Sequence, residues 1–249
     1  MTTQDAPRRR RLTWLWWLIG IVVVLGVLVV VADIAGRAYA EGRVADEIES
    51  RLPAGVEGDV DVTIGGGSFL AQLASGRIDQ VDLDAPSLAA NGVPFSAHVT
   101  ATGVPTDLTK PVEHATGTFA LDQAAVDSVV TLPEGASLQL GDGTVSYDQT
   151  GEFLGIQLGY TVTGEVTAQG TSVRIEPTGA ELTQGSNALD VSGLLDRVIG
   201  SAVTVCVAQY LPQGVSLQTL EVTPGQASVV ATLDDFVLDE STLSTLGTC

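Results

Sequence analysis

The chain has 249 residues, of which 45% are hydrophobic and 5% aromatic, and it carries 11 Lys and Arg against 30 Asp and Glu. The formal net charge of −19 excludes a nucleic-acid-binding protein, because binding phosphates requires clustered Lys or Arg. The same charge would repel an anionic membrane surface, so adsorption by basic attraction is not expected either.

The N-terminal region contains one long apolar stretch. Residues 12–32 form an uncharged run of 21 residues, preceded by four arginines at 8–11. As a helix rising about 1.5 Å per residue, the run would span the roughly 30 Å hydrocarbon core of a bilayer. The arginines keep that end in the cytoplasm, and three tryptophans near the start of the run match an interfacial aromatic belt. The sequence thus predicts a single-pass cell-membrane protein with a cytoplasmic basic tail (1–11), a transmembrane anchor (12–32) and an extracytoplasmic domain (33–249).

A cleaved secretory signal is the alternative interpretation of this stretch. Ala38, Tyr39 and Ala40 fit the small-x-small pattern of a cleavage site. The apolar run is longer than the roughly 7–15 residues of a signal core, and the site lies well beyond its end. A retained anchor is therefore favoured, and either interpretation exports the domain.

The chain has two cysteines, Cys206 and the last residue, Cys249. Both lie in the exported part, where disulfides persist, so a bridge between them is expected. It would close a loop that the chain-entropy account values at roughly 4 kcal/mol. Two unpaired thiols are the alternative.

The spacing of apolar residues changes along the domain. Residues 33–52 keep a helical spacing up to Pro53, so the apolar helix is expected to continue and to dock on the domain. Ser68 should cap a short helix that Gly76 closes, Asp122 should cap another, and the longest soluble helix is expected from Ser192 to about Tyr210. Alternation predicts strands around 60–64, 81–85, 95–101, 119–121, 138–140, 145–147, 156–166, 173–175, 215–222 and 227–233.

These elements predict the fold class α+β. The N-terminal transmembrane helix is followed by one domain, in which a curved antiparallel β-sheet packs on two or three helices. Aliphatic residues supply the apolar faces, since aromatic residues are scarce. Such a sheet could close as a dry core, or it could leave a groove for acyl chains, and the pattern alone fits both.

Few residues favour catalysis. The pairs Asp59/Asp61 and Asp82/Asp84 put carboxylates on one strand face, but that face is the polar one and is expected to meet water. His98 and His114, the only histidines, have no second histidine at metal-ligand spacing, and G-x-S-x-G is absent from the sequence. We therefore predict no catalytic residue, no metal and no cofactor. A hydrolase or transferase is kept as an alternative hypothesis, since the residues of a catalytic triad can be distant in sequence and adjacent in the fold.

Residues 62–85 read VTIGGGSFLAQLASGRIDQVDLDA, and later Cys206 is followed by Tyr210-Leu211-Pro212 and by Gly214-Val215. With the N-terminal apolar helix and the near-terminal cysteine, these features resemble the actinobacterial LmeA-type phospholipid-binding family. The resemblance implies a curved sheet similar to tubular lipid-binding domains. It also implies binding of a phospholipid such as phosphatidylinositol and a role in building the mannolipids of the cell envelope.

On this resemblance we predict a non-catalytic phospholipid-binding protein that supports envelope lipoglycan (mannan) biosynthesis. A membrane mannosyltransferase is a possible protein partner, and the second hypothesis is a scaffold or regulator of such an enzyme without a lipid cavity. Arg77 is the candidate headgroup contact, with solvation of a loop as the alternative. The residues predicted to line the lipid site are Phe69, Leu70, Leu73, Arg77, Val81 and Leu83.

Overall fold

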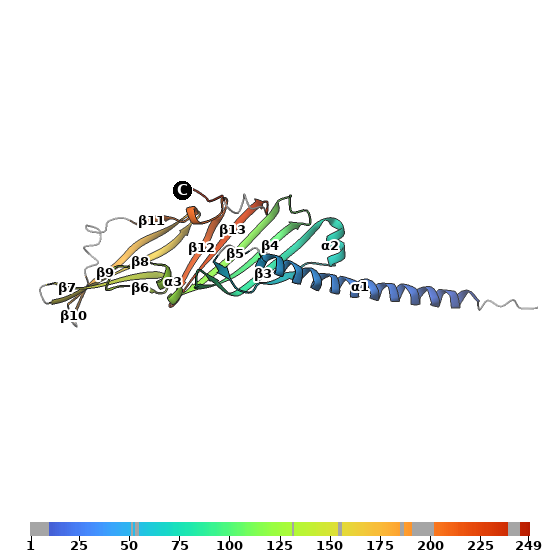
Figure 1. Ribbon diagram of the computed structural model, residues 1–249, viewed down its shortest axis with the longest axis horizontal. Helices are drawn as coiled ribbons and strands as arrows, with labels where there is room; N and C mark the ends of the chain where they lie inside the picture. Colours follow the sequence, from blue (N-terminus) through green and yellow to red (C-terminus); the bar gives the residue numbers. More distant parts are fainter. Residues whose placement is uncertain are drawn as a thin grey trace, which may run out of the picture.

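The computed structural model describes residues 10–50, 52, 55–130, 132–153, 156–184, 187–190, 202–238 and 245–249 (Figure 1). One long helix, α1 (Arg10–Ser50), spans 41 residues. The side chains of its described apolar part, from Trp14 to Val31, are exposed, and this part projects away from the β-structure. Its second half packs on the domain, so the prediction that the apolar helix continues past residue 32 is confirmed.

The second half of α1 covers one end of the β-structure. Ala45 and Ile48 pack against a buried cluster that includes Val60 and Val62. Two α1 carboxylates accept backbone hydrogen bonds: Glu49 from the N–H of Val60 at 2.9 Å and Glu41 from the N–H of Ile64 at 2.8 Å. These N–H groups belong to an edge strand and the residue before it, so α1 satisfies donors that would otherwise template pairing with another chain.

Within the described part of the chain, all strand pairs are antiparallel and form two sheets. The first sheet has the order β1-β3-β4-β5-β13-β12, with β2 on β3. Its strands are β1 (Val56–Glu57), β2 (Asp61–Ile64), β3 (Arg77–Ala90), β4 (Val93–Pro105), β5 (Val112–Asp122), β12 (Ser216–Thr223) and β13 (Gln226–Phe236). The second has the order β10-β9-β8-β7-β6, with β11 on β9. Its strands are β6 (Ala136–Leu140), β7 (Thr144–Phe153), β8 (Ile156–Gln169), β9 (Ser172–Gln184), β10 (Asn187–Asp190) and β11 (Val203–Cys206).

The two sheets continue one another. The N–H of Leu217 in β12 donates to the carbonyl of Gly170 at 2.7 Å, and the N–H of Gly143 donates to the carbonyl of Val222 at 2.8 Å. Figure 1 shows the strands as one long curved band with few helices. The predicted class, α+β with a curved antiparallel sheet, is confirmed.

Two short helices follow their predicted capping signals. In α2 (Phe69–Ser75), the Ser68 hydroxyl accepts from the N–H of Ala71, and Gly76 ends the helix at φ 77°. A positive φ strains residues with a Cβ, so glycine is the favoured residue there. In α3 (Gln123–Val129), the Asp122 carboxylate accepts from the N–H of Ala125 at 2.7 Å.

The prediction of a helix from Ser192 to about Tyr210 is wrong for the described residues of that segment. Val203–Cys206 form β11, and a single 3₁₀ turn follows at Ala208–Tyr210. β-Branched Val203, Thr204 and Val205 favour an extended backbone, and β9 supplies the hydrogen-bond partners that local spacing could not reveal. Residues 192–201 lie outside the described part of the chain.

The predicted disulfide is present. Cys206 and Cys249 are joined at an S–S distance of 2.05 Å, and no described cysteine is free. The bridge ties the carboxyl terminus to strand β11, where a helix had been expected.

Candidate lipid-binding site

One face of the first sheet is apolar from edge to edge. Alternate residues of a strand point to opposite faces, so the register shows which side chains share a face. The shared face carries three rows of mostly aliphatic side chains. They are Val81–Ala101–Ala115–Leu233, Leu83–Val99–Gly117–Ala231–Leu217 and Ala85–Ala97–Phe119–Val229–Leu220.

The apolar face continues into the second sheet. Val145, Val166 and Ile175, from β7, β8 and β9, pack in one cluster with Leu220 and Val222 of β12. Beyond this junction, the same face carries three exposed apolar or aromatic side chains, Leu158, Tyr160 and Leu182. The apolar surface thus extends from the α1 end of the curved band toward its opposite end.

Helices cover the ends of the first sheet's apolar face more than its middle. At one end α1 packs on the cluster that includes Val62 and Ala85, and near the other sheet Val126 of α3 packs beside Leu220. Between them, most of the side chains are only half-buried. They are Val99, Ala101, Ala115, Phe119, Val229 and Leu233. A dry core would bury such residues fully, so this part of the face resembles the lining of an apolar ligand site.

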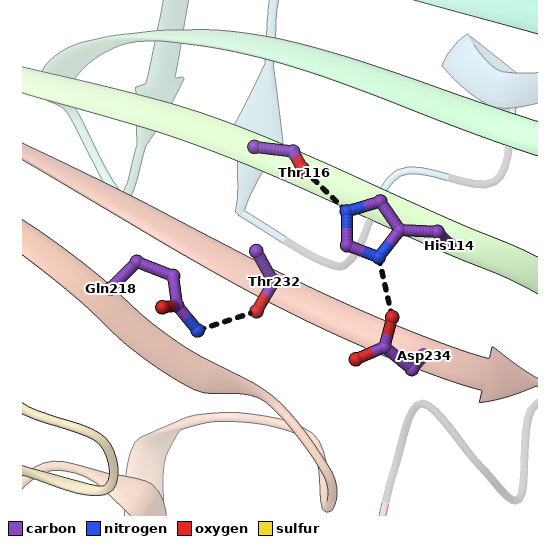
Figure 2. Close-up of polar contacts among 5 residues, drawn as sticks. All are labelled: His114, Thr116, Gln218, Thr232 and Asp234. Atoms are coloured by element: carbon purple, nitrogen blue, oxygen red, sulfur yellow. Dashed lines mark hydrogen bonds and ion pairs between the residues drawn. The ribbon is translucent and has the colours of Figure 1, made fainter.

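The opposite face of the same strands is polar. It carries Thr100, Thr102, Thr116, Thr118 and Thr232 together with Asp82, Asp84, His98, His114 and Asp234. Figure 2 shows part of this face: His114 lies between Asp234, which contacts its Nδ1, and the Thr116 hydroxyl, 3.0 Å from its Nε2. Gln218 donates to Thr232 beside them at 2.9 Å.

The Asp234–His114–Thr116 contacts have the order of an acyl-transfer triad. However, β5 and β13 are inner strands whose backbone N–H groups point into ladders on both sides, so they are not free to form an oxyanion hole. The three side chains also lie on an exposed sheet surface. We interpret the cluster as cross-strand hydrogen bonding that stabilises the sheet.

The described residues do not support metal binding either. They contain no group of three or more His, Cys, Asp or Glu placed to hold a metal ion. His98 lies 3.8 Å from Asp84 on the exposed face, and Asp82 accepts hydrogen bonds from Thr100 and Gln80, each at 2.7 Å. Asp82 and Asp84 therefore lie on the polar face with these neighbours, as the alternation predicted.

The six predicted lipid-site residues fall in two places. Val81 and Leu83 lie on the apolar face, and the other four lie on α2 or just after it. On α2, Phe69 is 7% exposed against Ile64 and Ile78, whereas Leu70 and Leu73 are exposed. Their role as lipid contacts stays a prediction.

Arg77 begins β3 and forms an exposed ion pair with Glu113 of β5. The hydrogen bond from Arg77 lowers the pKa of the Glu113 carboxyl below its ordinary value, and the same bond raises the pKa of Arg77. A lipid phosphate at Arg77 would have to compete with this carboxylate.

The face residues of β5, β12 and β13 were not among the predicted site residues. Their alternation was visible in the sequence, but the pairing of β13 with β5, which adds Leu233 to the row of Ala115, was not. Pairing between distant segments is set by the whole fold, not by local spacing.

In a comparison with known protein families, residues 31–232 match the family described as LmeA-like phospholipid-binding. Comparisons with curated proteins and with solved structures return no match. The matched region starts near the end of the apolar run 12–32, and it covers β3, β4, β5 and β12 completely and β13 up to residue 232. The chain therefore belongs to the LmeA-like phospholipid-binding family.

Proposed function

We propose that this protein is a membrane-anchored, extracytoplasmic and non-catalytic phospholipid-binding protein, with the acyl chains lying on the apolar face of β4, β5, β13 and β12. The half-buried aliphatic rows in the middle of that face carry the proposal. Acyl chains need such lining and few polar groups.

The energetics fit a protein that both takes up and releases lipid. Burying a methylene from water is worth about 0.8 kcal/mol, so a bound acyl chain does not escape into water. An acyl chain in a bilayer is already out of water, however. Its exchange between bilayer and protein face is thus close to balanced in hydrophobic free energy, which favours reversible loading.

Retention of the N-terminal helix is supported by its packing. The part of α1 before the cleavage-like residues Ala38 to Ala40 contains Asp33 and Arg37, which bind the α2 region through hydrogen bonds. Cleavage after Ala40 would remove those contacts. α1 is also long and apolar enough to cross a membrane, and its apolar window is not buried against the protein. The disulfide fits a domain outside the cytoplasm.

The role in mannan biosynthesis and the mannosyltransferase partner rest on the family resemblance. A strain that lacks the protein should produce altered envelope lipoglycan, and the wild-type chain should restore it. Restoration by a variant that no longer binds lipid would instead favour the scaffold function.

Mapping the lipid contacts tests the binding site. The full chain would be purified in mild detergent, loaded with a phosphatidylcholine that carries a photoreactive diazirine in its acyl chain, and irradiated. We expect lipid adducts on peptides from β4, β5, β12 and β13, because those strands carry the half-buried rows. Adducts confined to residues 12–32 would contradict the proposal, since any membrane anchor contacts lipid there.

A further inference from the structure

Hydrogen bonds attach the N-terminal end of α2 to α1 at Asp33 and Arg37. The Asp33 carboxylate accepts a hydrogen bond from the Ser68 hydroxyl at 2.6 Å and another from the N–H of Leu70 at 2.8 Å. Arg37 donates to the carbonyl of Gly67 just before α2. The hydrogen bonds from Ser68 and, to a smaller extent, Leu70 lower the pKa of the Asp33 carboxyl below its ordinary value. Asp33 is therefore charged at neutral pH.

The other side of α2 is held by the sheet. The Gln72 side chain, only 6% exposed, donates to the carbonyl of Gly65 at 3.0 Å and accepts from the N–H of Asp79 at 2.8 Å. Phe69 is buried beside Ile64 and Ile78. α2 is therefore fixed to both α1 and β3 and cannot shift along α1 without losing these contacts.

Asp33 is the first residue after the uncharged run 12–32. If that run spans the bilayer, as proposed above, a charged residue there lies at the membrane surface, and so does the N-terminal end of α2. Figure 1 shows α2 at the end of the sheet from which the free part of α1 projects.

The remaining side of α2 is apolar and uncovered. Leu70 is 38% exposed and Leu73 is 51% exposed, and residues three apart share one side of a helix. Leucine side chains exposed at the membrane surface favour the boundary between headgroups and acyl chains, whereas the many acidic residues of the domain favour water.

We infer that α2 docks on the bilayer through Leu70 and Leu73 and holds this end of the sheet at the membrane, where phospholipid can pass between bilayer and apolar face. The inference rests on the proposed membrane anchoring, and it adds a second membrane contact to the anchor. The partner is the bilayer interface itself, because α2 lies at the level of the residue where the apolar run ends.

Spin-label depth measurements on the full chain in phosphatidylcholine vesicles test this inference. No described cysteine is free, so a single introduced cysteine offers one labelling site. Three variants are compared: Leu73→Cys on α2, Leu246→Cys near the carboxyl terminus as a control of similar exposure (53%), and Val22→Cys within the apolar run. Each label is tested for collision with oxygen and with a water-soluble nickel chelate.

We expect the Leu73→Cys label about 5–10 Å into the headgroup and acyl boundary, whereas the Leu246→Cys label is in water. A Leu73→Cys label as accessible to nickel as Leu246→Cys, with the Val22→Cys label in hydrocarbon, would overturn docking but leave the anchoring intact. A Val22→Cys label outside the hydrocarbon would overturn both.

Discussion

Tryptophan at both Ala101 and Ala115 should remove phospholipid binding and leave the domain folded. The two alanines are directly opposite on β4 and β5, half-buried, in the middle of the apolar face. Each indole covers about 150–250 Å², so the pair would occupy the surface that an acyl chain needs. We expect the phospholipid retained per chain to fall at least about tenfold, which corresponds to 1.4 kcal/mol.

The matched control carries tryptophan on the opposite face of the same strands, as Thr102→Trp with Thr118→Trp. These side chains point away from the apolar rows, so lipid retention should stay at the wild-type level. Retention is measured by mass spectrometry of extracted lipid, and circular dichroism reports folding. A folded Ala101→Trp/Ala115→Trp variant with its full lipid complement would show that acyl chains lie elsewhere.

Replacing both cysteines by serine should cost about 4 kcal/mol of the free energy of unfolding, from the loop-closure entropy of a bridge over this separation. The bridge joins residues 43 apart and holds the carboxyl terminus on β11, which pairs with β9. Without the bridge, the unfolded chain gains freedom, and the terminus loses its link to the sheet. Urea denaturation of the variant and of the wild type measures the difference.

Reductant provides the control for this prediction. It should lower the urea midpoint of the wild type to that of the Cys206→Ser/Cys249→Ser variant and leave the variant unchanged. Equal midpoints for the oxidised wild type and the variant would mean that the bridge contributes nothing to stability.

Elements with local signals were predictable from the sequence. α2 has its predicted cap at Ser68 and its predicted end at Gly76, and the strands predicted around 138–140 and 145–147 are present as β6 and β7, which pair with each other. The disulfide was predictable because the chain has only two cysteines and its apolar N-terminal run predicted an exported domain. In each case, a few neighbouring residues or a count determine the outcome.

Features that depend on distant pairing were not predictable. β11 is a strand because β9 lies beside it, although the spacing around Val203 and Val205 also fitted a helix. The helical spacing of residues 33–52 predicted that α1 docks on the domain, but not that Glu41 and Glu49 accept hydrogen bonds from the edge strand β2 and its preceding residue. The complete apolar face likewise required the register between β5 and β13.

Native mass spectrometry of the full chain tests the central claim, that this protein binds phospholipid in stoichiometric amounts. The chain would be extracted gently from its own membrane in detergent micelles and released from them in the spectrometer. We expect a species carrying phospholipid of defined mass, and exchange of that lipid when phosphatidylcholine or phosphatidylinositol is added. A folded chain that carries no lipid and takes up neither would contradict the account and would direct attention to a protein partner.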